Sequence, residues 1–178
     1  MIEQDAETRL ATTIARVAAW SQPFYPLYIY FAAGTLAWPA FLSLLSTPFF
    51  GAVPWLARRN PAGAKALLVM TGVINTTLCM VAMGETSLVF AYLAPILLLA
   101  VLIFPVKDWW NLALLLAATI AIATSGHLAA RAITPGFTLE QSRSLALMHL
   151  ASAAALTALI LFLHRRGKPP ATAAPPPR

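Results

Sequence analysis

Long apolar stretches separated by short polar turns dominate the sequence. The two clearest stretches are Trp109 to Ile133 and Ser144 to His164, and the polar turn Thr134 to Arg143 lies between them. Each stretch reaches or exceeds the roughly 20 residues that a helix needs to cross the apolar core of a bilayer, which is about 30 Å thick. We therefore expect a transmembrane helical hairpin here, with the other apolar segments packed around it.

Further apolar stretches precede this hairpin. As a helix, Val17 to Ala57 would cover about 60 Å, just enough for two crossings, and we expect its turn near Gly34 to Trp38. Ala66 to Met83 and Ser87 to Pro105 predict one crossing each. The sequence thus predicts an all-α fold, a polytopic membrane helix bundle with six transmembrane helices. The alternative is five crossings plus a re-entrant segment in the proline-rich first stretch.

The basic residues lie at the ends of these stretches. The net charge is +6, yet only 10% of the residues are charged and 60% are hydrophobic, whereas soluble domains carry roughly 25% charged residues. Arg58, Arg59 and Lys65 surround one turn, and Arg165 and Arg166 follow the last stretch. Because Lys and Arg mark cytoplasmic loops, we expect a multi-pass membrane protein with both termini cytoplasmic. We expect no nucleic-acid partner.

The two ends of the chain differ from the bundle. Residues 1–16 are expected to form a cytoplasmic polar segment with an amphipathic helix in the headgroup region, since Leu10 and Ile14 share one helical face. Residues 17–166 are expected to form the transmembrane bundle. Residues 167–178 are rich in proline and alanine, so we expect them to be extended and disordered.

Small residues recur at intervals of four in the last two apolar stretches. Such residues allow the close approach by which helices associate in lipid. The positions that we expect to serve helix packing are Ala113, Ala117, Ala121, Ser125, Ala151 and Ala155. The pattern predicts packing within the chain or, as the alternative, the seam of a homodimer.

Two histidines are the strongest candidates for a binding site. His127 and His149 are both expected about 8 to 10 Å below the outer surface, on adjacent helices. Arg131 follows His127 by one helical turn, and Glu85 belongs to the same outer rim. Because ionisable groups inside a membrane are usually functional, these residues predict an outward-opening ligand pocket. The alternatives are neutral imidazoles bonded to nearby carbonyls or hydroxyls, and a facing pair of haem ligands.

Catalytic motifs are missing from the sequence. It has no Gly-rich phosphate loop, no Ser/His/Asp arrangement and no His-x-x-x-His or Glu-x-x-His metal pattern. Its single cysteine, Cys79, cannot form an internal disulfide and is expected to be a small buried thiol. We therefore expect a protein that is not an enzyme and that holds no metal and no cofactor, unless the haem alternative applies.

A few loop residues and the spacing of the helices carry a resemblance. Arg58-Arg59-Asn60 precedes a stretch containing Asn75, and Gly84-Glu85 precedes a stretch ending Leu102-Ile103-Phe104-Pro105. Across residues 20–166 this resembles the six-helix membrane sensor modules of bacterial class III adenylate cyclases, diguanylate cyclases and histidine kinases. The resemblance implies a location in the bacterial inner (cytoplasmic) membrane, cytoplasmic ends and a sixth helix that passes a signal, often in a dimer. Only a Pro/Ala tail follows here, so we expect a stand-alone relative or a fragment.

These patterns predict a non-enzymatic integral membrane protein, a stand-alone sensor-like or accessory module that binds a small ligand or partner within the membrane. Ligand binding near His127 and His149 would shift the last two helices, and their cytoplasmic end would report it. One alternative is a structural subunit of a larger respiratory or photosynthetic membrane complex. Another is a b-type haem protein. The expected partners are the lipid bilayer and either a second copy or another membrane protein.

Overall fold

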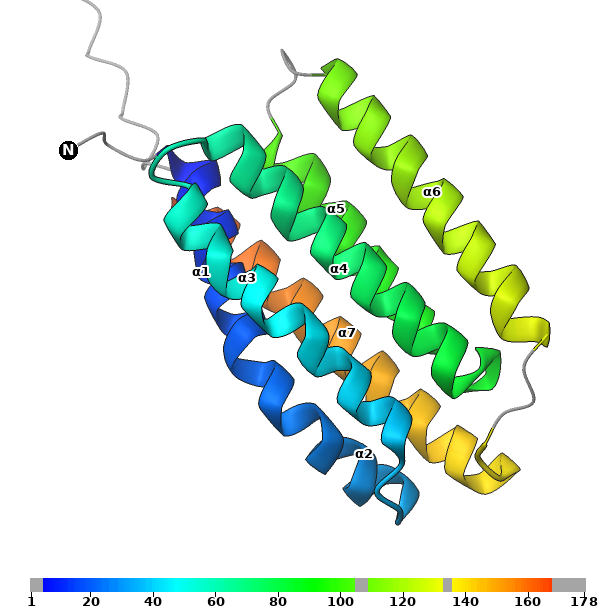
Figure 1. Ribbon diagram of the computed structural model, residues 1–178. Helices are drawn as coiled ribbons and strands as arrows, with labels where there is room; N and C mark the ends of the chain where they lie inside the picture. The colour runs from blue at the N-terminus through cyan, green and yellow to red at the C-terminus, as the bar shows by residue number, and fades with distance from the viewer. Residues whose placement is uncertain (1–4, 105–108, 133–135, 168–178) are drawn as a thin grey trace, which may run out of the picture.

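The chain forms a bundle of helical rods in a computed structural model, which describes residues 5–104, 109–132 and 136–167 (Figure 1). The described residues form helices and turns and no strand, which confirms the all-α class. The elements are the α-helices α1 (Ala6–Ser21), α2 (Tyr25–Ala33), α3 (Thr47–Leu56), α4 (Pro61–Met83), α5 (Leu93–Ile103), α6 (Trp109–Ala132) and α7 (Leu139–Gly167), and the 3-10 helices η1 (Gln22–Phe24), η2 (Trp38–Ser46), η3 (Glu85–Ser87) and η4 (Val89–Tyr92). Apart from Gly167, the predicted disordered tail lies outside the described residues.

We call each continuous helical run a rod: α1–η1–α2, η2–α3, α4, η4–α5, α6 and α7. The rods run between two ends of the bundle (Figure 1). We call the end where α1 begins, α3 meets α4 and α7 finishes the terminal end. The opposite end, with the turn from α2 to η2, the η3 helix and the start of α7, is the hairpin end. The turn after α2 begins at Gly34, which has a left-handed φ of 68° and lies where the sequence predicts it.

Prolines divide the first two rods into segments. Pro23, Pro26, Pro39 and Pro48 all occupy the first or second position of a helical element, where the missing N–H group costs no hydrogen bond. In η2, the hydroxyl groups of Ser43 and Ser46 donate to carbonyls three residues earlier. Such bonds compete with the helical backbone pattern, and they accompany a 3-10 run of unusual length.

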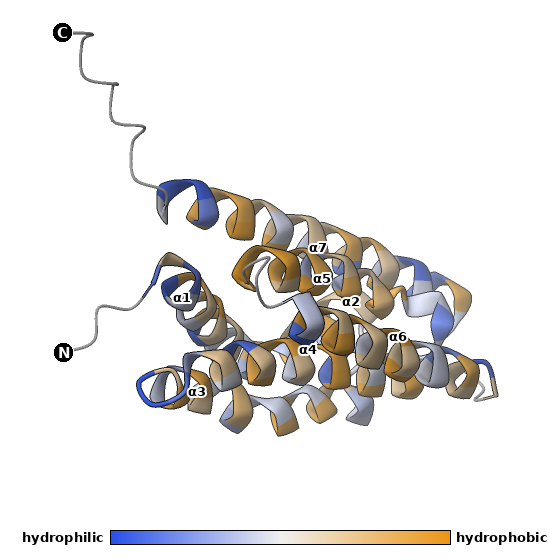
Figure 2. Ribbon diagram, turned by 90° about the horizontal axis from the view of Figure 1, so that it is seen from above, coloured by the Kyte–Doolittle hydropathy of each residue, from blue (hydrophilic) through white to orange (hydrophobic). Residues whose placement is uncertain are grey.

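Four helices are long and apolar enough to cross a membrane. They are Trp38–Leu56, Pro61–Met83, Trp109–Ala132 and Leu139–Gly167, while Val89–Ile103 is a shorter apolar helix. Hydrophilic residues gather toward the ends of the rods and hydrophobic residues cover their length (Figure 2). Many large apolar side chains are exposed along the rods, as lipid contact requires. The expectation of a helical membrane bundle is therefore confirmed at this coarser level.

The centre of the bundle is α4, and the expectation that the other segments pack around the last hairpin is wrong. Half of the residues in the most apolar part of α4 are buried, whereas only 17% are buried in the corresponding part of α6 and 22% in that of α7. The α4 helix packs against α1, α3, η2, α5 and α6, whereas α7 packs against α1, α2, α5 and the η3–η4 segment. Figure 1 shows α6 along α4, away from α7. Sequence periodicity does not reveal this, because faces toward lipid and faces toward protein are equally apolar.

The contact between α6 and α4 uses a different face of α6 from the one that we expected. The buried side of α6 carries Leu115, Thr119, Gly126 and Ala130. A Cβ atom at Gly126 would overlap Cγ2 of Thr77 on α4, so the glycine permits the close approach. Of the predicted packing positions, Ala113 is half-buried and the rest are exposed: Ala117, Ala121, Ser125, Ala151 and Ala155. Ala155 lines a cavity between the helices. For the other exposed positions, use as a homodimer seam stays a prediction.

At the terminal end, α1 is anchored by its first residues. Oδ1 of Asp5 accepts a hydrogen bond from the amide of Thr8, and Nζ of the buried Lys65 lies 3.5 Å from Oδ2 of Asp5. Partial burial alone would raise the pKa of Asp5, but the hydrogen bonds from Thr8 and the charge of Lys65 outweigh it and lower the pKa. The apolar face of α1, including Leu10 and Ile14, is buried in the bundle. Its depth relative to the headgroups stays a prediction.

Replacing Gly126 by alanine is expected to destabilise the bundle by about 1–3 kcal/mol, the usual range for overpacking. The added Cβ would overlap Thr77 and lie 3.1 Å from Cε of Met80. Gly51→Ala is the control, because a Cβ there meets no heavy atom within 4 Å. Thermal unfolding in detergent measures both variants. Equal midpoints would contradict the α4–α6 contact.

Candidate functional site

His149 is the most buried ionisable group of the candidate site. It lies on α7 with 0% of its surface exposed. Its Nδ1 atom lies 2.7 Å from the carbonyl oxygen of Ser87, and its Nε2 atom lies 2.9 Å from the hydroxyl of Tyr25. Because a carbonyl only accepts, Nδ1 donates, and Nε2 of the neutral ring accepts from the tyrosine. These bonds connect α7 to η3 and to α2.

Aromatic rings hold the imidazole on two sides. The Tyr25 ring is stacked against it with centroids 6.0 Å apart, and the Tyr92 ring meets it edge-on at 6.1 Å. Sδ of Met83 lies 3.6 Å from the Tyr25 hydroxyl. The ring of His149 is therefore fixed both by hydrogen bonds and by packing. Sequence reasoning did not single out either tyrosine.

The other predicted site residues form an ion cluster at the hairpin end. Oε1 of Glu85 lies 3.7 Å from Nε2 of His127, and Oε2 of Glu85 lies 3.6 Å from Nε of Arg131. The structure thus brings these three residues together, as the expected rim requires. Their side chains are 40–65% exposed, and such exposed ion pairs contribute about 0–1 kcal/mol.

The two histidines do not face one another. Both ring nitrogens of His149 are engaged by Ser87 and Tyr25, while His127 pairs with Glu85. This differs from the facing pair that haem ligation through His127 and His149 needs. The physical reason is that α6 packs along α4 and not along α7. Among the described residues, no group of three or more His, Cys, Asp or Glu could hold a metal ion.

The short η3 helix connects the ion cluster with the buried histidine. Glu85 and Ser87 both belong to this three-residue element. The Ser87 hydroxyl donates to the carbonyl of Gly84, and Leu88 follows with a left-handed φ of 54°. A non-glycine residue in this region costs on the order of 1–3 kcal/mol. The surrounding contacts therefore hold η3 in one conformation, which positions the Ser87 carbonyl.

A cavity of about 450 Å³, partly open to the surface, lies between the helices next to this network. Its volume is in the usual range for small-molecule sites, about 300–1,000 Å³. Side chains from α1, η1, α2, η2, α3, α4, η4, α5 and α7 line it, and Tyr25 and Tyr92 belong to this lining. Glu85, His127, Arg131 and His149 are not among its lining residues, and His149 acts on the cavity only through the tyrosines that it holds.

Sequence reasoning missed the cavity, although one signal was available. Asn75 is a polar residue in the middle of α4, and its side chain lines the cavity. Polar groups inside membrane helices usually mark functional positions. The single cysteine, Cys79, lies one turn further along α4 and is buried, as expected.

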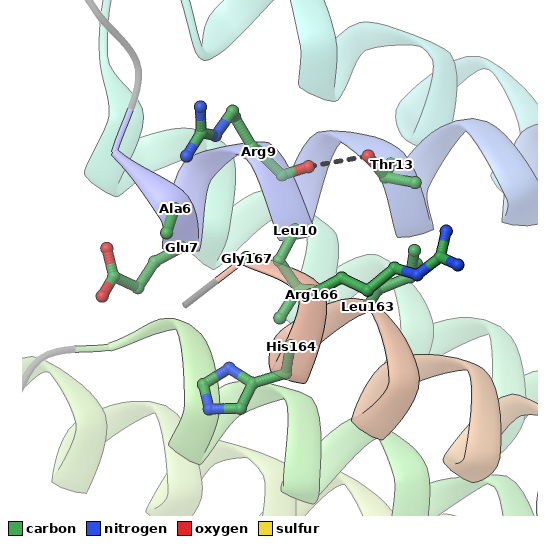
Figure 3. A pocket seen from close by; sticks show the side chains of 9 residues that line it. All are labelled: Ala6, Glu7, Arg9, Leu10, Thr13, Leu163, His164, Arg166 and Gly167. Carbon is green, nitrogen blue, oxygen red and sulfur yellow. Dashed lines mark hydrogen bonds between the residues drawn. The ribbon is translucent and has the colours of Figure 1, made fainter. Parts of the chain in front are cut away.

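A second pocket, of about 410 Å³, separates the start of α1 from the end of α7 (Figure 3). It contains Arg9 on α1 and His164 and Arg166 on α7. Figure 3 shows that the two guanidinium groups point in different directions. The basic groups therefore do not converge on one point, and the pocket marks a loosely filled junction between two helices.

Loss of the hydrogen bond between Tyr25 and His149 should destabilise the protein. We expect Tyr25→Phe to cost about 1 kcal/mol, typical of a hydrogen bond inside a membrane protein. His149→Ala should cost more, because it also leaves a void and the unpaired carbonyl of Ser87. The double variant should cost less than the sum, since both changes remove one shared bond. Unfolding in mixed micelles measures these costs.

The exposed Tyr30 provides the control for this cycle. Tyr30→Phe removes the same hydroxyl group from α2 without touching the network, so it should leave the free energy of unfolding unchanged. Strict additivity of the Tyr25 and His149 variants would show that their side chains are not bonded.

The candidate site thus combines three features. They are a buried histidine held by two tyrosines, an ion cluster at the hairpin end, and an interior cavity that shares the tyrosines. The first two features meet in η3, and the first and third meet in Tyr25 and Tyr92. No family model, no curated protein and no solved structure matches the chain.

Proposed function

We propose that the protein is a non-enzymatic, sensor-like or accessory module of the bacterial inner membrane, and that it binds a small ligand inside its helical bundle. The observation that carries the proposal is the cavity of about 450 Å³. Its lining offers hydroxyl and amide groups for binding and, among the described residues, no carboxylate or imidazole for acid–base catalysis. Membrane protein sites between helices commonly bind ligands in this way.

A six-crossing topology is part of the proposal. The segment from Ala6 to Ala33 is helical throughout and covers about 40 Å, enough for one crossing. Val89–Ile103 is the shortest rod. The alternative is five crossings, with a re-entrant segment in the proline-rich first stretch. All rods run between the same two ends (Figure 1). Arg58, Arg59 and the arginines at the end of α7 lie at the terminal end, which supports a cytoplasmic location for it.

The geometry suggests how binding would be reported. Both α1 and α7 line the interior cavity, and the same two helices line the pocket at the terminal end (Figure 3). A ligand that favours one separation of these helices would shift the population of that arrangement. The basic end of α7, His164 to Arg166, would then present the change to a partner. This agrees with the signal-passing sixth helix that the resemblance to bacterial sensor modules implies.

The role of a structural subunit in a larger respiratory or photosynthetic complex is the second candidate. The exposed side of α6 favours this role because it carries small residues. Only 17% of the residues in the most apolar part of this helix are buried within the chain. Small residues suit close helix contacts in lipid. A second copy of the chain or another membrane protein would occupy this side.

Filling the cavity should abolish ligand binding. Leu156 lines the apolar part of the cavity on α7, so we expect Leu156→Trp to reduce binding at least tenfold. Leu150→Trp is the matched control, because Leu150 is exposed on the same helix and does not line the cavity. Ligands extracted from the purified protein and measured by mass spectrometry provide the readout. Equal ligand content in both variants would refute the interior site.

Accessibility of single cysteines tests the topology. In a Cys79→Ala background, an impermeant maleimide added outside spheroplasts should label Thr86→Cys at the hairpin end. Glu7→Cys and Asn60→Cys should react only after lysis, because both lie at the terminal end. Labelling of Asn60→Cys from outside would reverse the orientation. Labelling of Glu7→Cys together with protection of Asn60→Cys would favour five crossings.

A further inference from the structure

We infer that the cavity binds an uncharged, single-chain amphiphile, with its apolar chain toward the terminal end and a hydroxyl head group toward the hairpin end. This inference rests on the proposed ligand-binding function and names the class of the ligand. It is carried by the order of side chains along the cavity, by the absence of charge in its described lining, and by one unpaired acceptor.

The lining of the cavity changes from apolar to polar along α4. Leu68, Val69 and Gly72 line it in the half of α4 nearer the terminal end, and Asn75 and Cys79 line it further along. The distance from Leu68 to Cys79 along the helix is about 16 Å at 1.5 Å per residue. The cavity is therefore elongated along the bundle axis, with chemically different ends.

The neighbouring rods show the same gradient. On α7, which runs in the opposite direction, Ile160 and Leu156 lie toward the terminal end and Ser152 lies toward the hairpin end. On α5 and the η4 helix before it, Leu99 lies toward the terminal end and Tyr92 toward the hairpin end. Antiparallel rods thus bring their polar side chains to the same half of the cavity.

The first rod completes the polar half. Ile14 and Val17 of α1 line the apolar half, whereas Gln22 and Tyr25 line the cavity one to two turns later. Tyr25 is held from behind by His149, so this part of the wall is preorganised. A ligand with an apolar chain and a polar head matches the gradient in one orientation only.

The head group must be neutral and must donate a hydrogen bond. The described lining contains no Asp, Glu, Lys, Arg or His, so a charged head would lose its hydration without gaining a counter-ion. Oε1 of Gln22 is buried and has no hydrogen-bond partner within the described part of the chain. A buried acceptor of this kind is normally satisfied. Gln22 also lines the cavity, so a rotation of its side chain toward the ligand would let a hydroxyl group supply the missing donor.

The ligand can enter from the lipid. Val17, Ser21 and Tyr28 line both the cavity and a neighbouring surface groove, which Arg16, Trp20 and Phe24 complete. Arg16 lines this outer groove and is not part of the cavity lining. The edge of the cavity therefore reaches the lipid-facing surface beside α1 and α2. Amphiphiles dissolved in the bilayer have direct access along this path.

Three probes with the same chain and different heads test the inference. The purified full chain in detergent is labelled with a photoreactive analogue of dodecanol, and dodecanol, dodecanoate and dodecane compete for the site. We expect dodecanol to compete at least tenfold better than dodecanoate and better than dodecane. Equal or better competition by dodecanoate or dodecane would overturn the assignment of a neutral hydroxyl head.

Gln22→Met removes the acceptor and keeps the length of the side chain. It should weaken competition by dodecanol about two- to tenfold, as the loss of one hydrogen bond predicts, and leave dodecane unchanged. Asn111→Leu removes an amide from the exposed surface of α6 and should change neither. An unchanged affinity for dodecanol in Gln22→Met, at an unchanged thermal midpoint, would overturn the role of Gln22.

The proposed function and this inference fail in different ways. Labelling that Leu156→Trp does not reduce, or no labelling by any probe, would refute the interior ligand site itself. Labelling that Leu156→Trp blocks, but that dodecanoate or dodecane competes as well as dodecanol, would keep the site and refute the ligand class. Both results come from the same preparation and the same readout.

Discussion

Polar groups inside an apolar solvent must find their partners within the chain, and His149 shows how this requirement orders the structure. Neither the lipid nor the apolar side chains around it can satisfy an imidazole. Its two ring nitrogens are satisfied by Ser87 and Tyr25, which belong to elements far apart in the sequence. The hydrogen bonds of one side chain thus join α2, η3 and α7, and they hold Tyr25, which belongs to the wall of the cavity.

The proline-rich first half of the chain explains why a cavity exists next to this network. Long regular helices pack by fitting ridges into grooves and leave little space between them. Here the first rod is interrupted by η1, and the second rod begins with the nine-residue 3-10 helix η2. The change of helical geometry at η1 and η2 interrupts the regular ridges of side chains along these two rods. Gln22, Ser43 and Asn75 line the space that is left.

The sequence predicted the kind of fold better than its internal arrangement. The lengths of the apolar stretches located the helices, and Gly34 located a turn. Both signals depend only on residues that are neighbours in the sequence. The packing partners of α6 and α7 could not be predicted, since Ala117 toward lipid and Ala130 toward α4 look alike in the sequence. For the site, the sequence placed Glu85 and Arg131 on one outer rim, and the structure brings them together. The expected pairing of His127 with His149 is not observed, because α6 packs along α4. Tyr25 could not be predicted, because its contact with His149 depends on tertiary structure alone.

The position of α6 has a consequence for how such a protein can change. This helix packs on the outside of α4 and supplies no side chain to the cavity lining. Substitutions on the exposed side of α6 are therefore expected to change its contacts with neighbouring molecules in the membrane and to leave the lining of the cavity unchanged. Under the proposed function, the specificity for a ligand and the specificity for a neighbouring protein would therefore reside in separate parts of one small chain, and each could diverge while the other is retained.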